Sequence, residues 1–108
     1  MNREELIIEK LRDKKAEEIC VVNITRDILI DKFIIANATS SYHLKTLSEY
    51  LKQELKEYIY GIDGNPDSEW IVVDVGDILI HLFTDRMRRI YNLEELGETI
   101  KKEGNNGK

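Results

Sequence analysis

The segment "WIVVDVGDILIHLF", residues 70–83, constrains the fold of this 108-residue chain more than any other. Two runs of mostly β-branched and aliphatic residues flank Gly76 and Asp77, and a glycine at the first position suits a two-residue type II′ turn. The sequence therefore predicts a β-hairpin centred on this turn, in which Trp70 lies opposite Phe83.

Alternation of side chains along the strands divides this hairpin into two faces. One face is entirely aliphatic, and we expect it to pack against helices. The other face is apolar and aromatic but also carries a carboxylate and an imidazole, a composition typical of a protein-binding surface. The alternative is that a further helix covers this second face and that its acid and its histidine form an internal pair. The residues of the second face are Trp70, Val72, Asp74, Leu79, His81 and Phe83.

The remaining segments show helical or strand-like patterns in alternation. Helices are predicted over residues 2–15 and 40–58 and from Asn92 onward, and strands over residues 19–24, 33–38 and, near the turn-rich "GIDGNPDS", 58–62. This order predicts an α/β (α+β) fold in which helices pack on a small mixed β-sheet of about five strands. We expect one domain over residues 1–103 and a flexible tail over residues 104–108.

Charge and composition exclude several classes of function. A net charge of −5 and a pI near 5.1 argue against broad contact with nucleic acid, because such contact needs clustered lysine and arginine. A protein partner that is basic where it is touched fits better. The lone Cys20 lies in an apolar run and indicates a reducing cytoplasm. Neither a signal peptide nor a membrane-spanning run is expected.

Metal-dependent chemistry is the first alternative to a binding role. Asp74 and Asp77 could hold a metal ion, but Asp74 lies on the strand while Asp77 belongs to the turn, so they do not form the paired carboxylates that phosphoryl transfer uses. Residues 63–74 resemble part of a calcium loop, yet Ser68 stands where glycine is needed. No metal, no cofactor and no catalytic residue is therefore predicted.

Two further polar groups have ordinary structural explanations. Ser40 and His43 could suggest a nucleophile and a base, but serine at a predicted helix start most often caps the helix. Arg86, Arg88 and Arg89 form the one dense basic cluster. We expect these arginines to pair with nearby acids, with a minor contact to RNA as the alternative.

Four segments in series resemble the ribosomal silencing factor family, also called the Iojap-like proteins. They are "DKKAEEICVVNI", "DKFIIANATSSYH", "SEWIVVDVGDILIHLF" and "RRIYNLEEL", and they span the chain from about Asp13 to Leu96. The resemblance implies a nucleotidyltransferase-like fold whose members lack the catalytic carboxylates of that superfamily. The chain departs from the family pattern at Ala38, Tyr42 and Gly97.

The resemblance also implies a function. It predicts a non-enzymatic factor that binds the large ribosomal subunit through large-subunit ribosomal protein fourteen, blocks joining of the small subunit and represses translation. A homodimer in solution is implied as well. A degenerate metal-dependent nucleotidyltransferase and a self-associating adaptor remain alternatives. The positions implied to contact the partner are Trp70, Asp74, Asp77, His81, Phe83, Arg89, Tyr91 and Leu93.

Overall fold

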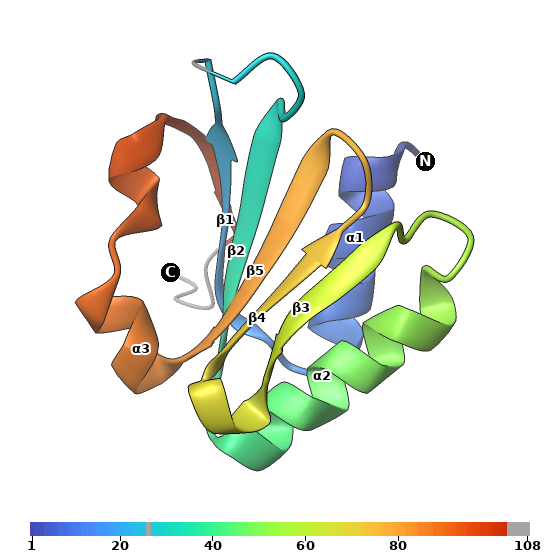
Figure 1. Cartoon of the computed structure of the whole chain (residues 1–108), viewed down its shortest axis with the longest axis vertical. Helices are drawn as coiled ribbons and strands as arrows, with labels where there is room; N and C mark the ends of the chain where they lie inside the picture. The colour runs from blue at the N-terminus through green and yellow to red at the C-terminus, as the bar shows by residue number, and fades with distance from the viewer. Residues whose placement is uncertain (26, 104–108) are drawn as a thin grey trace.

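The structure, a computed structural model, describes residues 1–25 and 27–103, and the tail expected over residues 104–108 lies outside this range. A six-stranded mixed sheet forms the centre of the molecule, in the order β3-β4-β5-β2-β1-β6 (Figure 1). The strands are β1 (Glu17–Asn23), β2 (Lys32–Ala38), β3 (Gly61–Asn65), β4 (Trp70–Asp74), β5 (Ile78–Thr84) and β6 (Glu98–Glu103). The helices are α1 (Arg3–Asp13), α2 (Ser41–Glu54) and α3 (Asp85–Ile90), with the short 3₁₀ turns η1 (Pro66–Ser68) and η2 (Leu93–Leu96).

Helix α1 and helix α2 begin at the capping residues that the sequence indicates. The side chain of Asn2 accepts a hydrogen bond from the Glu5 amide at 2.8 Å, and the Glu5 carboxylate accepts one from the Asn2 amide at 3.1 Å. Ser40 caps α2 in the same way by accepting from the His43 amide at 3.0 Å. The second helix was predicted to extend to residue 58, but α2 ends at Glu54, and the Tyr58 side chain beyond it is 40% exposed. None of the helices in the described part of the chain is long and apolar enough to cross a membrane.

The predicted hairpin is confirmed in its register and in the position of its turn at Gly76 and Asp77. Five residue pairs join β4 to β5, from Trp70 opposite Phe83 to Asp74 opposite Leu79. Gly76 has a φ of +93°, a value that L side chains rarely adopt, so the turn requires its glycine.

The other strands assemble around this hairpin. Strand β5 pairs in parallel with β2, whereas the four other neighbouring pairs of the described sheet are antiparallel. Strand β3 was expected over residues 58–62 and lies a few residues later, paired with β4 at one edge of the sheet.

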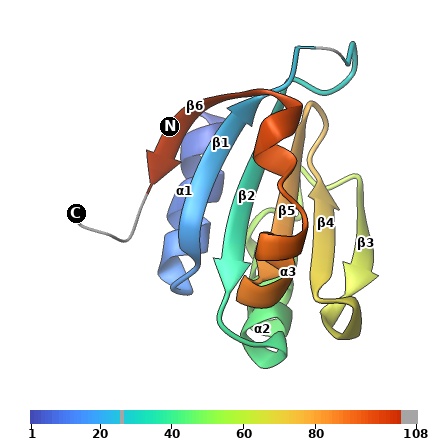
Figure 2. The same ribbon diagram turned by 90° about the vertical axis from the view of Figure 1, so that its left-hand side faces the viewer.

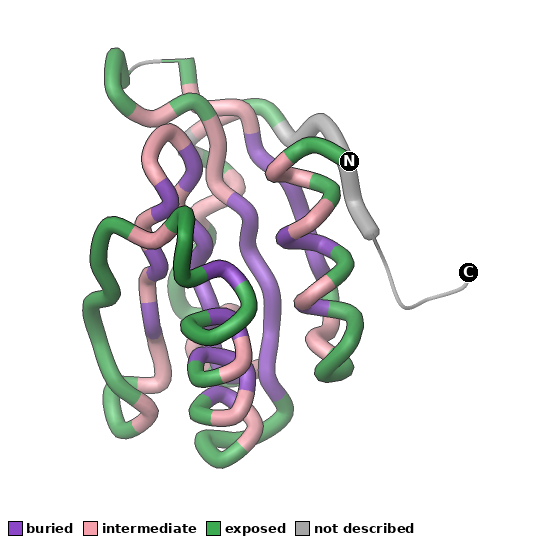
Figure 3. The backbone as a smooth tube through the Cα atoms, turned by 90° about the vertical axis from the view of Figure 1, so that its right-hand side faces the viewer, coloured by how far each residue is buried: buried purple, intermediate pink, exposed green. Residues whose placement is uncertain are grey.

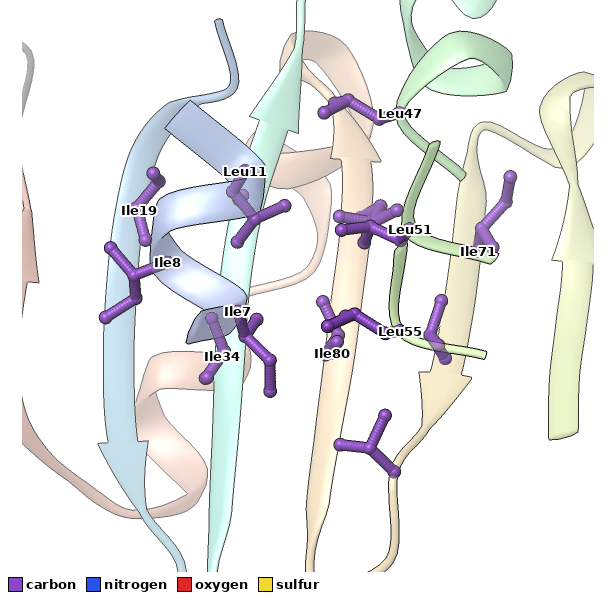
Figure 4. Packing of buried hydrophobic residues seen from close by; sticks show 14 of the residues in the cluster. Ile7, Ile8, Leu11, Ile19, Ile34, Leu47, Leu51, Leu55, Ile71 and Ile80 are labelled. Carbon is purple, nitrogen blue, oxygen red and sulfur yellow. The ribbon is translucent and has the colours of Figure 1, made fainter. Parts of the chain in front are cut away.

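Helices α1 and α2 cover one face of the sheet and bury the aliphatic face of the hairpin, as predicted (Figure 3). In Figure 4, Leu47 and Leu51 of α2 and Leu55 just after it lie over the strands that carry Ile71 and Ile80, with Leu55 beside Ile80. Each of these five side chains is at most 2% exposed, and each buried side chain of this size contributes about 1.5–3 kcal/mol of transfer free energy. The aliphatic hairpin residues buried in this core are Ile71, Val73, Val75, Ile78, Ile80 and Leu82.

The prediction of a helix from Asn92 onward is wrong. The short helix α3 begins earlier, where the Thr84 hydroxyl accepts a hydrogen bond from the Met87 amide at 3.3 Å, and β6 then follows η2. Strand β6 pairs with β1 and makes the sixth strand, one more than the sequence indicated. Gly97 permits this pairing, because a Cβ atom there would lie 2.1 Å from the carbonyl oxygen of Asn23.

Candidate partner-binding face

The second face of the hairpin is partly covered and partly open. Helix α3, η2 and the chain between them lie across the side of the sheet opposite α1 and α2, whereas β3 and β4 lie beside this segment (Figure 2). The expected cover by a further helix therefore holds for one part of this face, and the other part is open. We call it the aromatic face and define it by Phe33, Trp70, Val72, Leu79, His81, Phe83 and Tyr91.

Ring contacts organise the aromatic face around Trp70. The Trp70 ring lies 5.0 Å from that of Phe83 and 4.9 Å from that of Tyr91, measured between centroids. Phe33 contacts His81 edge-on at 4.4 Å. Phe83 is fully buried, Trp70 is half-buried and Tyr91 is 44% exposed, so the cluster passes from the interior to the surface. Phe83 thus supports the surface from below, while Trp70 and Tyr91 form it.

A hydrogen bond between two side chains fixes the tautomer of His81. The indole Nε1–H of Trp70 donates to His81 Nδ1 at 3.1 Å, so the neutral imidazole carries its proton on Nε2. Burial lowers the pKa of His81 to about 4, because an imidazolium would lose its hydration there. Within the described residues, Nε2 is buried without a hydrogen-bond partner. The internal pair considered for His81 is therefore formed with Trp70 and not with Asp74.

A polar network holds α3 against the sheet beside the aromatic face. Arg88 donates to the side-chain oxygen of Asn37 at 2.5 Å and to the backbone carbonyl of Glu18 at 3.1 Å. It also forms an ion pair with Glu94 at 3.7 Å. Asn37, which is 2% exposed, donates in turn to the carboxylates of Glu18 and Asp85. Because every buried polar group named here is paired, the network fixes the position of α3 without leaving an uncompensated charge.

The local pairing expected for the arginine cluster is confirmed at two of its three members. Arg86 forms an ion pair with Glu69, whose carboxylate also accepts a hydrogen bond from the Thr84 hydroxyl at 2.8 Å. These contacts lower the pKa of the Glu69 carboxyl and raise that of Arg86. Arg88 belongs to the network just described. Arg89 is exposed on α3 and has no ion-pair partner within the described range.

The two aspartates of the hairpin lie at its turn end, where Asp74 pairs with Leu79 of the aromatic face. Asp74 accepts a hydrogen bond from the Gly76 amide at 2.9 Å and so stabilises the turn. Asp77 forms an ion pair with Arg3 at 3.1 Å, at the beginning of α1. Among residues 1–25 and 27–103, no three metal-binding side chains of the histidine, cysteine, aspartate or glutamate type lie close enough together to hold a metal ion.

The serine and histidine at the start of α2 have structural roles. His43 Nδ1 accepts a hydrogen bond from the Thr39 amide at 2.9 Å, and its Nε2 lies 2.7 Å from the carbonyl oxygen of Lys14. His43 therefore ties the end of α1 to the turn before α2. Cys20 is buried, and its thiol lies 3.6 Å from a carboxylate oxygen of Glu94.

Sequence reasoning missed three residues of this region. Phe33 packs on His81, Met87 packs from α3, and Asp63 projects from β3, which pairs Asp63 with Val72. The pairing register of β3 with β4 would have placed Asp63 beside this face, but the turn-rich sequence does not reveal that register. Leu93, which was implied by the resemblance, packs against the buried cluster under the face.

Residues 2–106 match the family model described as "Ribosomal silencing factor during starvation". The chain belongs to the ribosomal silencing factor family. A ribosomal silencing factor of Halalkalibacterium halodurans is 31% identical over 107 residues, which cover 93% of this chain and 92% of that protein. A mouse protein named "Mitochondrial assembly of ribosomal large subunit protein 1" is 31% identical over 85% of this chain and 43% of its own length.

A solved structure shares the fold of this ribosomal silencing factor family member. The crystal structure of a Chromobacterium violaceum protein is 30% identical, has a TM-score of 0.81 and aligns with 94% of this chain and 90% of its own. The family resemblance and the α+β fold expected from the sequence are confirmed.

Proposed function

We propose that this protein binds the large ribosomal subunit through large-subunit ribosomal protein fourteen and sterically hinders joining of the small subunit. Membership of the ribosomal silencing factor family supports a role on the ribosome. The observation that carries the proposal is the aromatic face, where Trp70 of β4 and Tyr91 at the end of α3 remain accessible and their rings lie against each other. Such aromatic residues are typical centres of protein interfaces.

The mechanism needs no chemical step. A bound factor occupies a surface that the small subunit would contact, so repression depends on affinity and size alone. Aromatic residues supply most of the binding free energy, and the acidic surface of a chain with a net charge of −5 favours a basic partner. The proposal thus describes a non-enzymatic protein that acts in the cytoplasm, where ribosomal subunits join.

The direct test is co-sedimentation of this protein with separated large and small ribosomal subunits, followed by subunit joining monitored on sucrose gradients. We expect binding to large subunits and fewer joined ribosomes. Trp70→Ala should weaken large-subunit binding about 30- to 1,000-fold, the usual range for an aromatic hot spot. Tyr42→Ala is the matched control, because Tyr42 is 79% exposed on the opposite layer of the molecule. The proposal fails if wild-type protein pellets equally with both subunits or with neither.

Stability must be separated from binding in this test. Trp70 also packs on Phe83, so the free energy of unfolding of Trp70→Ala is measured by urea denaturation alongside binding. A variant that remains folded at the assay temperature and loses subunit binding supports the proposal. A Trp70→Ala variant that remains folded and binds large subunits as well as the parent would contradict a role of the aromatic face in binding.

A homodimer and a minor contact with ribosomal RNA belong to the same proposal. The open part of the aromatic face offers a surface for a second copy, and exposed Arg89 offers a cation for a phosphate. Light scattering across a concentration series checks the dimer, which should dissociate on dilution. A monomer at every concentration would remove this part of the proposal and leave ribosome binding untouched.

A further inference from the structure

A hollow of about 340 Å³ lies beside the aromatic cluster, between α3 and the β3–β4 edge of the sheet. It is lined by Asp63, Gly64, Ser68, Trp70, Val72, Met87 and Tyr91. Two aromatic rings, a valine and a methionine provide apolar walls. One carboxylate, that of Asp63, supplies the only formal charge among these lining residues. The hollow is thus an apolar and aromatic pocket with a single acid at its edge.

The fold of β3 explains why Asp63 lies at this hollow. Asp63 pairs with Val72, which pairs with His81, so all three side chains belong to the same face of the sheet. Gly64 allows β3 to approach β4 closely, since it has a φ of +89° and a Cβ atom there would lie 2.2 Å from the Trp70 carbonyl oxygen. The position of the acid beside the rings is therefore built into the strand pairing.

The Asp63 carboxylate has capacity left for a ligand. Its Oδ1 accepts a hydrogen bond from the Gly64 amide at 2.9 Å. Within the described part of the chain, no lysine or arginine forms an ion pair with it, whereas neighbouring Glu69 is already paired with Arg86. Asp63 is exposed, so its carboxylate is open to a cation from outside the described residues.

We propose that this hollow receives the side chain of an arginine presented by the protein partner. A guanidinium group stacks on tryptophan and tyrosine rings, its methylene stem packs on apolar walls, and its N–H groups donate to a carboxylate. The three kinds of lining group match these three parts of one side chain. The inference rests on the function proposed above, because it names the chemistry by which the partner is recognised.

Short peptides test the pocket apart from the ribosome. The chain has one tryptophan, so the single indole N–H signal in a ¹H–¹⁵N NMR spectrum comes from Trp70, whose ring lines this hollow. The probes are acetyl-Gly-Arg-Gly-amide and the same peptide with neutral citrulline in place of arginine. We expect saturable shifts with the arginine peptide and about tenfold weaker binding of the citrulline peptide. Equal responses to the two peptides would overturn the inference, as would stronger binding of adenosine, which would stack without needing the acid.

A matched pair of variants tests the acid. Asp63→Asn keeps the shape and the acceptor for the Gly64 amide but removes the charge, so arginine-peptide affinity should fall about five- to tenfold. Asp67→Asn is the control, because Asp67 is exposed on η1 and does not line the hollow. An arginine affinity that is unchanged by Asp63→Asn, or lowered equally by both variants, contradicts the assignment.

Co-sedimentation separates this inference from the proposed function. If wild-type protein binds large subunits and Asp63→Asn binds them several-fold more weakly, both proposals are supported. Wild-type protein and Asp63→Asn binding subunits equally well would overturn the arginine contact and leave ribosome binding standing. Failure of wild-type protein to bind any subunit, together with selective peptide binding, would overturn the proposed function and leave the pocket assignment standing.

Discussion

His81 shows at the scale of one residue how the aromatic face is kept neutral. Its Nδ1 accepts the Trp70 indole proton, its ring lies against Phe33, and its pKa is lowered to about 4 by burial. The imidazole therefore stays uncharged throughout the physiological range and behaves as a polar member of an aromatic cluster. It does not act as a proton carrier near neutral pH.

The lowered pKa makes the stability of the protein depend on pH in a defined direction. As pH falls below 6.5, the ordinary pKa of histidine, the unfolded chain takes up a proton at this position before the folded protein does. The free energy of unfolding should therefore fall as pH goes from about 7 to 5, by about 1–2 kcal/mol. Above pH 7, His81 adds no pH dependence.

Urea denaturation at pH 7 and pH 5 measures this effect. His81→Gln retains a side-chain acceptor but does not titrate, so its free energy of unfolding should change less over the same interval. The range stops at pH 5 because carboxylates begin to protonate below it. Identical pH dependence in the parent and the variant would show that His81 is not the titrating group.

At the scale of elements, two neighbouring arginines of α3 provide a controlled comparison. Arg88 bridges Asn37, Glu18 and Glu94, whereas Arg89 is exposed. A lysine keeps the charge but lacks the planar guanidinium, so Arg88→Lys should cost about 1–3 kcal/mol and speed hydrogen exchange in α3 and η2.

Arg89→Lys should leave both quantities within experimental error of the parent. Hydrogen exchange followed by mass spectrometry, with denaturation in parallel, compares the two variants directly. Similar behaviour of both variants would mean that the Arg88 network does not fix α3.

Gly97 gives a second prediction at the scale of elements. A methyl group at this position would meet the backbone carbonyl of Asn23 at 2.1 Å, so Gly97→Ala must push the start of β6 away from β1. We expect a loss of about 1–3 kcal/mol in unfolding free energy, with faster exchange in β1 and β6. Gly61→Ala is a suitable control, because no atom lies within 4 Å of a Cβ atom built there. Equal stability of the two variants would argue against close packing at Gly97.

The elements that the sequence predicts well are those whose signals are local. Asn2 with Glu5 marks the start of α1, and Gly76 fixes the hairpin and hence its two faces. The C-terminal segment was predicted as a helix from Asn92, but Leu93–Leu96 form only the 3₁₀ turn η2, and pairing with β1 makes Glu98–Glu103 a strand. The site was predicted in part for the same reason. Trp70 follows from the register of the β4–β5 hairpin, whereas Asp63 depends on the pairing of β3 with β4, which the turn-rich segment before Trp70 does not reveal.

At the scale of the whole molecule, the negative net charge favours a protein partner over free nucleic acid. The net charge is −5, and Arg86 and Arg88 of the arginine cluster are already paired, so within the described residues only Arg89 of that cluster remains for a phosphate. Naked ribosomal RNA fragments should therefore bind at least about tenfold more weakly than intact large subunits at physiological salt. Filter binding and co-sedimentation at the same ionic strength make the comparison. Equal affinities would indicate that RNA, and not a ribosomal protein, is the main target.

The parallel pairing of β2 with β5 has a consequence for the order of folding. The β4–β5 hairpin and the antiparallel β1–β2 pair each join strands that are neighbours in the chain. The parallel pairing of β2 with β5 cannot form until α2, β3, β4 and β5 have been synthesised. Closing so long a loop is slow compared with forming a hairpin. During synthesis, β2 therefore presents an unpaired edge until β5 leaves the ribosome, and such an edge favours aggregation.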